Sequence, residues 1–368
     1  MTEALSRLPE AIYEAAFVPE RWSGLLTEVA ESSNAASGSI LLFPGPGIPP
    51  RFRAAPFTEE ELGRHVTTDA WRSSRTAEAT FRNLRHPNFL GFSYVRDLMT
   101  PEEVAEDSVI GSLNRLGLDA QIGTIIPMIT GEIVVFTFER WLEHGRFTKG
   151  ETAILNSLRA HLARAGLIAA RLGLEQARGM VAGIEALGLP AAVLAGRRVL
   201  AANTLFEQEA TTFRIGAGNR LSLANVAADT LVQAALCSGP GAVAVRSVPL
   251  PATERRPALV VHVLPLSRAA HDIFSGDALI AVTAVDVQAG VPHPTILTGL
   301  FDLSPAEARL AVSLASGLSI KESATAAAIQ VSTARSYLES IFRKTGAHQQ
   351  SELVSLLKST AVIRPGRT

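Results

Sequence analysis

The stretches Leu303-Ser304-Pro305-Ala306-Glu307 and Gly317-Leu318-Ser319-Ile320-Lys321-Glu322 each contain the start signal of a helix. The serine of each stretch can accept a hydrogen bond from a backbone N–H of the first turn, and the glutamate three residues later can reach back to the serine. The proline of the first stretch stands where a missing donor costs nothing. We therefore predict one helix from the first serine to a left-handed exit at Gly317, and a second from Ser319 to about Ala327.

A third helix is predicted to follow the short segment Ile329–Ser332 and to end at Gly346. Its apolar residues recur at helical spacing and predict a buried face. Two short helices joined by a tight turn are typical of a helix-turn-helix, whose second member enters the major groove of DNA. The expected buried face consists of Ala334, Leu338, Ile341 and Phe342. The polar side, which is the candidate interface, carries Thr333, Arg335, Ser336, Tyr337, Glu339, Arg343 and Lys344.

Residues Ser304–Leu357 resemble the LuxR-type helix-turn-helix domain, which has four helices. The family favours Gly-Leu-Ser/Thr-Asn-Lys-Glu-Ile-Ala around the second helix. The chain matches that family in register at Gly317, Leu318, Ser319, Lys321, Glu322, Ala324, Ile329, Thr333, Leu338, Ile341, Arg343, Lys344 and Gly346. It departs from the family at Ile320, Ser323, Ala334, Tyr337 and Thr345. The smaller side chains at Ser323 and Thr345 remove apolar volume and predict a less stable domain.

The resemblance implies double-stranded DNA as a partner. We expect four residues to anchor the DNA backbone, namely Lys321, Thr333, Arg343 and Lys344. We expect three to read base edges, namely Arg335, Ser336 and Tyr337. The alternative is a sensory or scaffold protein that does not bind DNA and whose C-terminal helical bundle binds a protein partner, which would leave the match in register unexplained.

The distribution of charge agrees with this interpretation. Residues 297–368 contain eight Lys and Arg against five Asp and Glu, a net charge of +3, and because the whole chain is at −1 the remainder is at −4. A basic end on an acidic body is expected when one domain meets phosphate. With so few cations per copy, two copies should be needed for useful affinity, which predicts a homodimer on DNA.

Residues 188–287 are predicted to form a small α+β domain. Apolar runs at 189–194 and 199–203 flank the turn Ala195–Arg198, and a helix at about 225–236 precedes strands at 242–249, 258–266 and 278–285. This order, with Ala201-Ala202-Asn203 ending the hairpin, is similar to a PAS domain. The proline-containing segment Val291–Pro294 indicates a linker at 288–302, ahead of a helix-turn-helix domain at 303–360.

Residues 1–149 are predicted to form a second domain of this kind. An amphipathic helix at 10–32 leads to a strand at 38–43, and strands at 122–129 and 132–139 flank a hairpin turn. The arrangement is similar to a GAF- or PAS-like sensory domain, which many LuxR-type regulators carry. The expected fold class is therefore multidomain, with α+β domains of antiparallel sheets and helices followed by an all-α four-helix helix-turn-helix domain.

Residues 150–187 are predicted to form a connecting helix. Apolar residues recur at steps of three and four, as in a heptad seam, at Leu155, Leu158, Leu162, Ala165, Ala169 and Leu172. Such a stripe favours either a coiled-coil contact between two protomers or packing on the sheet of its own domain. The two alternatives are equally supported by the spacing.

No catalytic or metal site is indicated. The chain has no Gly-x-x-x-x-Gly-Lys loop, Gly216-Ala217-Gly218 is too short for a dinucleotide site, and the eight histidines show no metal spacing. We therefore expect a protein that is not an enzyme, with no identified cofactor. A single Cys237 and the lack of an apolar leader or of a membrane-length apolar run favour a cytoplasmic protein that does not enter a membrane.

A small-molecule effector is a further candidate partner, and so is RNA polymerase. Trp71 with Asp69, and Tyr94 with Asp97, superficially match the pocket residues of acyl-homoserine-lactone receptors, but their order and spacing do not. A different small molecule in one of the two α+β domains, or a domain without ligand that serves only to dimerise, are the alternatives.

Overall fold

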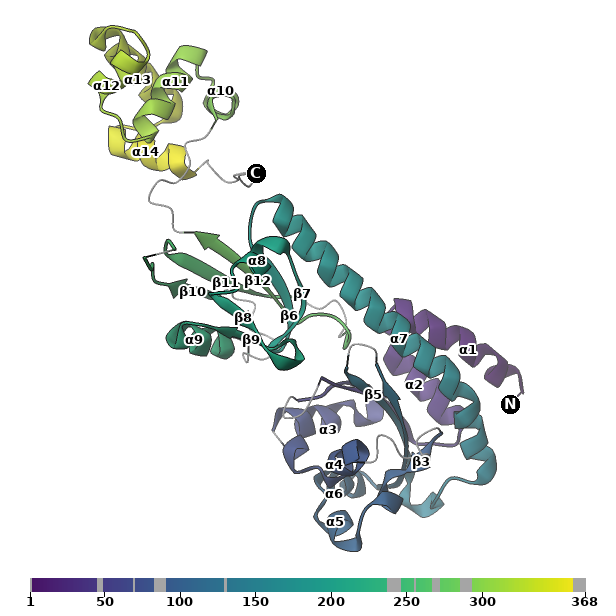
Figure 1. The fold of residues 1–368 in the computed structure, drawn as a ribbon. Coiled ribbons are helices and arrows are strands. Elements are labelled where there is room, and N and C mark those ends of the chain that lie inside the picture. Colours follow the sequence, from purple (N-terminus) through teal and green to yellow (C-terminus); the bar gives the residue numbers. More distant parts are fainter. Residues whose placement is uncertain are drawn as a thin grey trace.

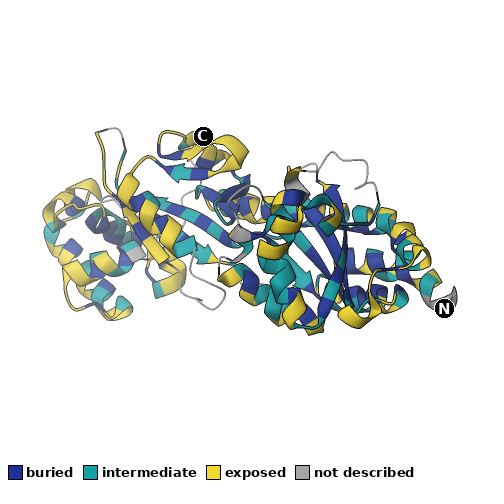
Figure 2. Ribbon diagram, turned by 90° about the horizontal axis from the view of Figure 1, so that it is seen from below, coloured by how far each residue is buried: buried dark blue, intermediate teal, exposed yellow. Residues whose placement is uncertain are grey.

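The structure is a computed structural model that describes residues 2–44, 49–68, 70–82, 91–128, 131–236, 246–254, 256–266, 272–284 and 293–359. It consists of two α+β domains joined by a long helix, followed by a small helical domain, and Figure 1 shows the three parts in a row. Figure 2 shows buried strands inside each α+β domain and exposed residues mainly on the outer sides of the helices. This agrees with the predicted fold class of α+β domains followed by an all-α domain.

The first domain is built on a five-stranded antiparallel sheet with the order β2-β1-β5-β4-β3. Its elements are α1 Thr2–Phe17, α2 Arg21–Ser32, β1 Ser37–Phe43, β2 Arg51–Ala54, α3 Pro56–Thr67, a 3-10 helix Ala70–Ser73, α4 Arg75–Arg82, β3 Ser93–Tyr94, α5 Pro101–Glu106, α6 Ser108–Arg115, β4 Leu118–Pro127 and β5 Ile133–Trp141. Helices α1 and α2 cover one face and α3, α4 and α6 lie on the other (Figure 1). The predicted strands are confirmed, whereas β2 and β3 were not predicted.

The amphipathic helix predicted at 10–32 is two helices in the structure. The chain leaves α1 after Phe17 and enters α2 at Arg21, with Pro19 in the turn between them. A proline lacks the N–H that a helix interior needs, and it disfavours the helical conformation of the residue before it. Periodicity alone did not reveal the break, because both helices bury apolar residues in the same core.

Helix α7, Lys149–Ala186, spans 38 residues and packs against both domains. It begins with a capping box between Thr148 and Glu151. The predicted apolar stripe lies in the core of the first domain with α1 and α2, where Leu155, Leu158, Leu162, Ala165 and Ala169 are buried. Because its own chain covers these residues, they are not available as a seam to a second protomer, and the alternative of packing within the domain is the one that the structure shows.

The second domain repeats the architecture of the first. Its elements are β6 Ala191–Ala195, β7 Arg198–Ala202, α8 Thr204–Gln208, β8 Phe213–Ile215, β9 Leu221–Leu223, α9 Val226–Leu236, β10 Arg246–Leu250, β11 Leu259–Pro265 and β12 Ala278–Ala284. The sheet order is β10-β11-β12-β6-β7 and all pairs are antiparallel. Strands β8 and β9 form a separate two-stranded sheet. If the five strands of the main sheet alone are numbered along the chain, their order is that of the first domain read from the other edge. The predicted hairpin and strands are confirmed where the structure describes them; 242–245 and Cys237 lie outside the described residues.

One segment of the second domain enters the core of the first. Phe274, from Asp272–Ser275, is buried in the apolar core of the first domain, where its ring centroid lies 6.5 Å from that of Trp22. The same segment passes over α7 at Gly173, where an added Cβ would lie 2.6 Å from the Phe274 carbonyl oxygen. The close approach therefore needs a glycine at this position.

A buried ionic cluster joins the two α+β domains beside this segment. Arg198 Nη1 of the second domain lies 2.7 Å from Glu132 Oε1 of the first, and Arg51 Nη2 lies 3.5 Å from the same oxygen. Arg51 Nη1 also donates to the Ser275 carbonyl oxygen, at 2.5 Å. Burying these charges costs desolvation free energy that offsets their mutual attraction, so the cluster adds little net stability.

The C-terminal domain contains α10 Pro294–Phe301, α11 Pro305–Ala315, α12 Ile320–Ala326, α13 Val331–Thr345 and α14 Gln350–Ser359. The linker predicted at 288–302 is therefore wrong for Pro294–Phe301. This segment forms a helix that starts at a proline and buries Leu297 in the core of the C-terminal domain. Residues 288–292 lie outside the described residues. Within the residues that the structure describes, no helix combines the length and the apolar composition needed to cross a membrane.

Candidate nucleic-acid interface

Two capping boxes fix the starts of α11 and α12. Ser304 Oγ accepts a hydrogen bond from the Glu307 N–H at 3.3 Å, and Glu307 Oε2 accepts one from the Ser304 N–H at 2.7 Å. Ser319 and Glu322 repeat the arrangement at 3.3 and 2.8 Å. Both predicted helix starts are confirmed, and so is the left-handed exit at Gly317, whose φ is 93°. The sequence encodes these starts locally, through side chains three residues apart.

The turn between α12 and α13 orients the third helix of the motif. Ala328 lies in the turn at φ 53°, a left-handed conformation that is energetically unfavourable for alanine. The next residue, Ile329, donates its N–H to the Ala324 carbonyl oxygen at 3.0 Å. Helix α13 then packs through Ala334 and Ile341, which are fully buried, and ends at Gly346 with φ 74°. The tight turn keeps α13 across α11 and α12 and leaves its opposite side in solvent (Figure 1).

The exposed side of α13 carries a mixed polar surface, which we call the α13 face. Its members are Ser332, Arg335, Ser336, Glu339 and Arg343. The predicted residues Arg335, Ser336 and Arg343 thus lie together, and Ser332 was missed because it was assigned to the lead-in of the helix. Thr333 and Tyr337 are half-buried at the edge, and the Tyr337 ring packs against the domain core.

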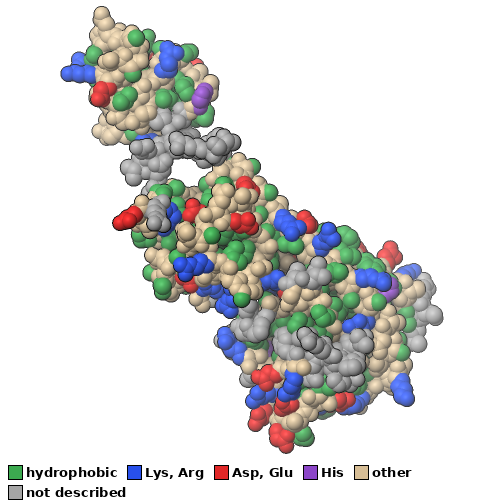
Figure 3. Space-filling model, viewed as in Figure 1, with side chains coloured by type: hydrophobic (Ala, Val, Ile, Leu, Met, Phe, Trp, Pro, Cys, Tyr) green, Lys and Arg blue, Asp and Glu red, His purple; other side chains and the backbone are tan. Residues whose placement is uncertain are grey.

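The cations of the α13 face and of α12 are available to a ligand. Lys321 on α12, Arg335 and Arg343 are exposed and form no ion pair with any residue that the structure describes. Arg343 Nη2 donates weakly to Ser340 Oγ at 3.3 Å. On the face of the C-terminal domain that Figure 3 shows, the Lys and Arg side chains stand apart from one another. Contacts from this surface would therefore be few and individually placed.

Lys344, which we predicted to anchor the DNA backbone, forms its contacts within the domain. Its Nζ donates to Glu307 Oε2 at 2.8 Å and to the Asp302 carbonyl oxygen at 2.9 Å, which ties α13 to the start of α11. Burial raises the pKa of Glu307, but hydrogen bonds from Lys344, Ser340 and Ser304 outweigh it and hold that pKa at about 2. Lys344 is thus engaged by contacts within the domain, unlike its neighbour Arg343.

Ser323 departs from the resembled family and lies fully buried in α12. Its Oγ has no hydrogen-bond partner among the described residues. A buried hydroxyl without a partner is destabilising. The predicted loss of core stability at this position therefore has a structural basis in addition to the missing apolar volume.

Comparisons with known proteins gave solved structures only; no family model and no curated protein matches this chain. A phage VqmA in complex with DPO is 15% identical over 52% of this chain and 91% of that chain, with a TM-score of 0.24. Escherichia coli SdiA is 10% identical over 92% of this chain and 90% of that chain, with a TM-score of 0.29. A complex of SdiA with octanoyl-rac-glycerol is also 10% identical, over 97% and 92%, with a TM-score of 0.27.

Proposed function

We propose that this chain is a DNA-binding transcription regulator whose C-terminal helix-turn-helix reads the major groove as a homodimer, under control of the two α+β sensory domains. The observation that carries the proposal is the α13 face, on which Arg335, Ser336 and Arg343 stand exposed on a helix that two capped helices support. A helix held across its neighbours with a free polar side is the geometry by which such motifs enter DNA.

The residues divide by their chemistry. Arg335 has a planar guanidinium that can pair with a guanine edge through two hydrogen bonds, and Ser336 can donate to either base type. Lys321 and Arg343, which have no ion pair with a described residue, suit phosphate oxygens. Thr333 and Tyr337 remain candidates at the edge of the face, and Lys344 is withdrawn from the interface because Glu307 holds it.

Dimerisation is proposed from the small number of cations. The three cations assigned to the candidate interface, Lys321, Arg335 and Arg343, give a modest electrostatic attraction to phosphate. Two copies on one duplex would double the contacts and fix the spacing of two half-sites. A small-molecule signal received by the sensory domains and RNA polymerase as a downstream partner belong to the same proposal.

The test is selection of the full-length protein on random duplex DNA at two salt concentrations. We expect a symmetric, salt-sensitive motif. Arg335→Ala should weaken binding to that motif by about 1–3 kcal/mol and relax the preference at one base position. Lys321→Ala should weaken binding to all sequences alike and reduce the dependence on salt.

Arg178→Ala is the matched control, because Arg178 is an exposed arginine on α7, outside the C-terminal domain. It should leave the motif unchanged. Equal losses on selected and random DNA from Arg335→Ala would contradict its base-reading role. Absence of any DNA affinity, together with salt-insensitive binding of a protein, would favour the scaffold alternative.

A further inference from the structure

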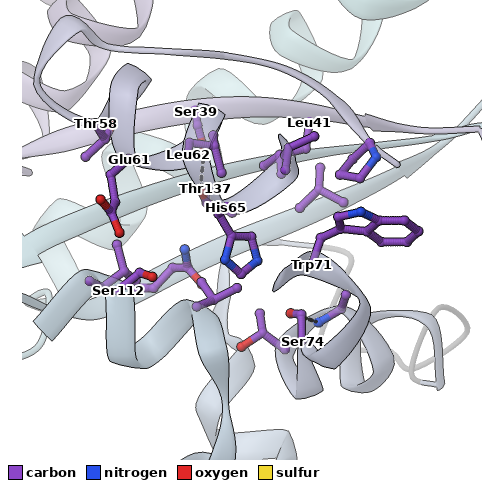
Figure 4. Close-up of a pocket in the computed structure, with 18 of the residues that line it drawn as sticks. Ser39, Leu41, Thr58, Glu61, Leu62, His65, Trp71, Ser74, Ser112 and Thr137 are labelled. Atoms are coloured by element: carbon purple, nitrogen blue, oxygen red, sulfur yellow. Dashed lines mark hydrogen bonds between the residues drawn. The ribbon is translucent and has the colours of Figure 1, made fainter. Parts of the chain in front are cut away.

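The first domain has a partly open cavity between its sheet and the helices α3, α4 and α6 (Figure 4). The cavity has a volume of about 110 Å³. For comparison, an engineered cavity of about 150 Å³ in another protein holds benzene. Its wall is mainly apolar and includes Leu41, Leu62, Val66, Trp71, Val109 and Val135. The size and the mainly apolar wall suit a compact compound of about one ring.

A chain of hydrogen bonds on the sheet ends at a carboxyl group in this cavity. Ser39 Oγ lies 2.7 Å from Thr137 Oγ1, the contact drawn as a dashed line in Figure 4. Thr137 donates to Glu139 Oε1 at 2.7 Å, and Gln121 Nε2 donates to the same oxygen at 2.9 Å. One oxygen of Glu139 is therefore saturated, and its orientation is fixed by neighbours on three strands.

The second oxygen of Glu139 has no partner within the described chain. Oε2 is buried, and the residue as a whole is 3% exposed. Burial raises the pKa of Glu139, against the hydrogen bonds from Gln121 and Thr137. A buried carboxyl oxygen is costly unless a donor or a cation reaches it. Glu139 is one of the residues that line the cavity, so its side chain borders that space.

His65 supplies a second polar atom on the opposite wall. It is 8% exposed, its Nε2 is buried without a partner among the described residues, and Figure 4 shows its ring projecting from α3 into the cavity. Burial lowers the pKa of His65, although Asp107 and Glu61 act in the opposite direction. The imidazole is therefore neutral at pH 7. Glu61, which also lines the cavity, is paired with Arg115 at 3.0 Å.

We propose that this cavity binds a compact ring compound that carries a nitrogen base or N–H donor, with the donor on Glu139 Oε2 and the ring against the apolar wall near His65. An organic cation of this size is the best match, because it supplies both the hydrogen bond and the charge that the buried carboxylate lacks. In this proposal an anion binds more weakly, because it would lie against the Glu139 carboxyl group. The inference deepens the proposed function by naming the class of signal, and its test involves no DNA, so either can fail without the other.

The experiment uses three benzene derivatives of nearly the same shape on the full-length protein. Benzamidine is a cation with N–H donors, benzamide is neutral, and benzoate is an anion. We expect calorimetric affinity to fall in that order, at least tenfold at each step. Binding should also change the tryptophan fluorescence, because Trp71 lines the cavity.

Glu139→Gln should reverse the order. The amide oxygen would keep the hydrogen bonds from Gln121 and Thr137, which places an NH₂ group where Oε2 stands. Benzamidine should then bind at least tenfold more weakly than benzoate. Glu143→Gln, which changes a carboxylate that is 82% exposed, is the matched control and should leave the order unchanged.

Ala77→Phe tests the location independently, since Ala77 lines the cavity and a phenyl ring there would fill it. It should abolish binding of all three compounds in a variant whose circular dichroism shows that it is folded. The proposal is overturned if benzoate binds the unchanged protein as tightly as benzamidine, or if benzamidine fails to bind at millimolar concentration. It is also overturned if a folded Glu139→Gln or Ala77→Phe variant binds benzamidine unchanged.

Discussion

The two α+β domains share one strand order. They differ in what lies on the inner face of the sheet, which is the face opposite to helix α7. In the first domain that face borders a cavity with the buried polar atoms of Glu139 and His65. In the second domain the matching face is filled by apolar side chains, among them Phe206 and Phe213, whose rings stack at 4.5 Å. Strand order therefore does not decide whether such a domain can hold a ligand; the side chains packed between the sheet and the elements that cover it do.

Helix α7 packs against the outer face of both sheets. The two domains nevertheless differ in how they are attached to this helix. Both domains pack on α7 through side chains, such as Leu158 and Leu162 for the first domain and Ala177 and Val181 for the second, but the second also brings a backbone carbonyl against Gly173. The attachment of the second domain therefore includes a close approach of main chains. It should therefore tolerate less change at the helix surface.

The largest expected effect comes from removing bulk from the filled domain. Phe206 is 1% exposed, and Phe206→Ala should lower the free energy of unfolding by about 3–5 kcal/mol, because the core cannot close around the missing ring. Leu62→Ala, at the wall of the existing cavity in the first domain, should cost about 1 kcal/mol, because Leu62 is half-buried and its removal enlarges a space already present.

Urea unfolding monitored by circular dichroism and by tryptophan fluorescence measures both. All three tryptophans, Trp22, Trp71 and Trp141, lie in the first domain, so fluorescence reports that domain and circular dichroism the whole chain. Equal losses from the two substitutions would show that the interiors do not differ in the way described.

A pair of glycine substitutions on α7 compares the two attachments. Gly173→Ala places a Cβ 2.6 Å from a carbonyl oxygen of the second domain, and it should destabilise the protein by about 1–3 kcal/mol through overpacking. Gly166→Ala meets only the flexible end of Met128, at 3.1 Å from its Cε. It should be neutral or stabilising by up to about 1 kcal/mol, because alanine favours the helix.

Gly179→Ala is the control for helix propensity alone, since an added Cβ there meets nothing within 4 Å. Thermal unfolding of the three variants gives the comparison. If Gly173→Ala behaves like Gly179→Ala, the second domain does not depend on the close approach.

The smallest expected effect is an opposite pH dependence in the two domains. Burial raises the pKa of Glu139 in the first domain, so the stability it contributes is complete below about pH 4.5 and is lost as the pH rises through the folded pKa. In the second domain, burial raises the pKa of Asp229, but hydrogen bonds from Arg197 and Leu223 outweigh it and lower the value. Its contribution is present above the unfolded pKa and is lost on acidification.

Glu139→Gln should therefore raise stability at pH 7, by on the order of 1 kcal/mol, and Asp229→Asn should lower it by a similar amount. Unfolding measured between pH 4 and pH 8 should show the two variants departing from the unchanged protein in opposite directions. If both variants were more stable, or both less stable, than the unchanged protein at pH 7, this distinction between the domains would be wrong.

The parts of the fold that local chemistry determines were predictable from the sequence. Capping boxes such as that of Ser304 and Glu307 act within one helical turn, and the hairpin around Gly196 is encoded by adjacent residues, so both predictions are confirmed. The stripe at Leu155 and Leu158 has the same spacing whether a second protomer or α1 covers it. Periodicity identifies a buried face without identifying what buries it.

The candidate sites also contain some features that local sequence determines and others that depend on residues far apart in the chain. The exposure of Arg335 and Arg343 follows from their positions on one helix, whereas the engagement of Lys344 depends on Glu307, which lies 37 residues earlier in the chain. A small-molecule site in one of the two α+β domains was predicted as an alternative, but the residues of the cavity were not. Its one signal is that Thr137 and Glu139 alternate with Phe136 and Phe138 in β5, which places two polar residues on a face that the helices then cover.

The uninterrupted course of α7 has a mechanical consequence. At the helical rise of 1.5 Å per residue its 38 residues form a rod about 57 Å long, with one half in each α+β domain. A rod without a hinge acts as a lever arm. A tilt of about two degrees where it leaves the first domain would displace its far end, about 28 Å away, by about 1 Å, so that a small change around the cavity would arrive at the second domain as a movement of atomic size.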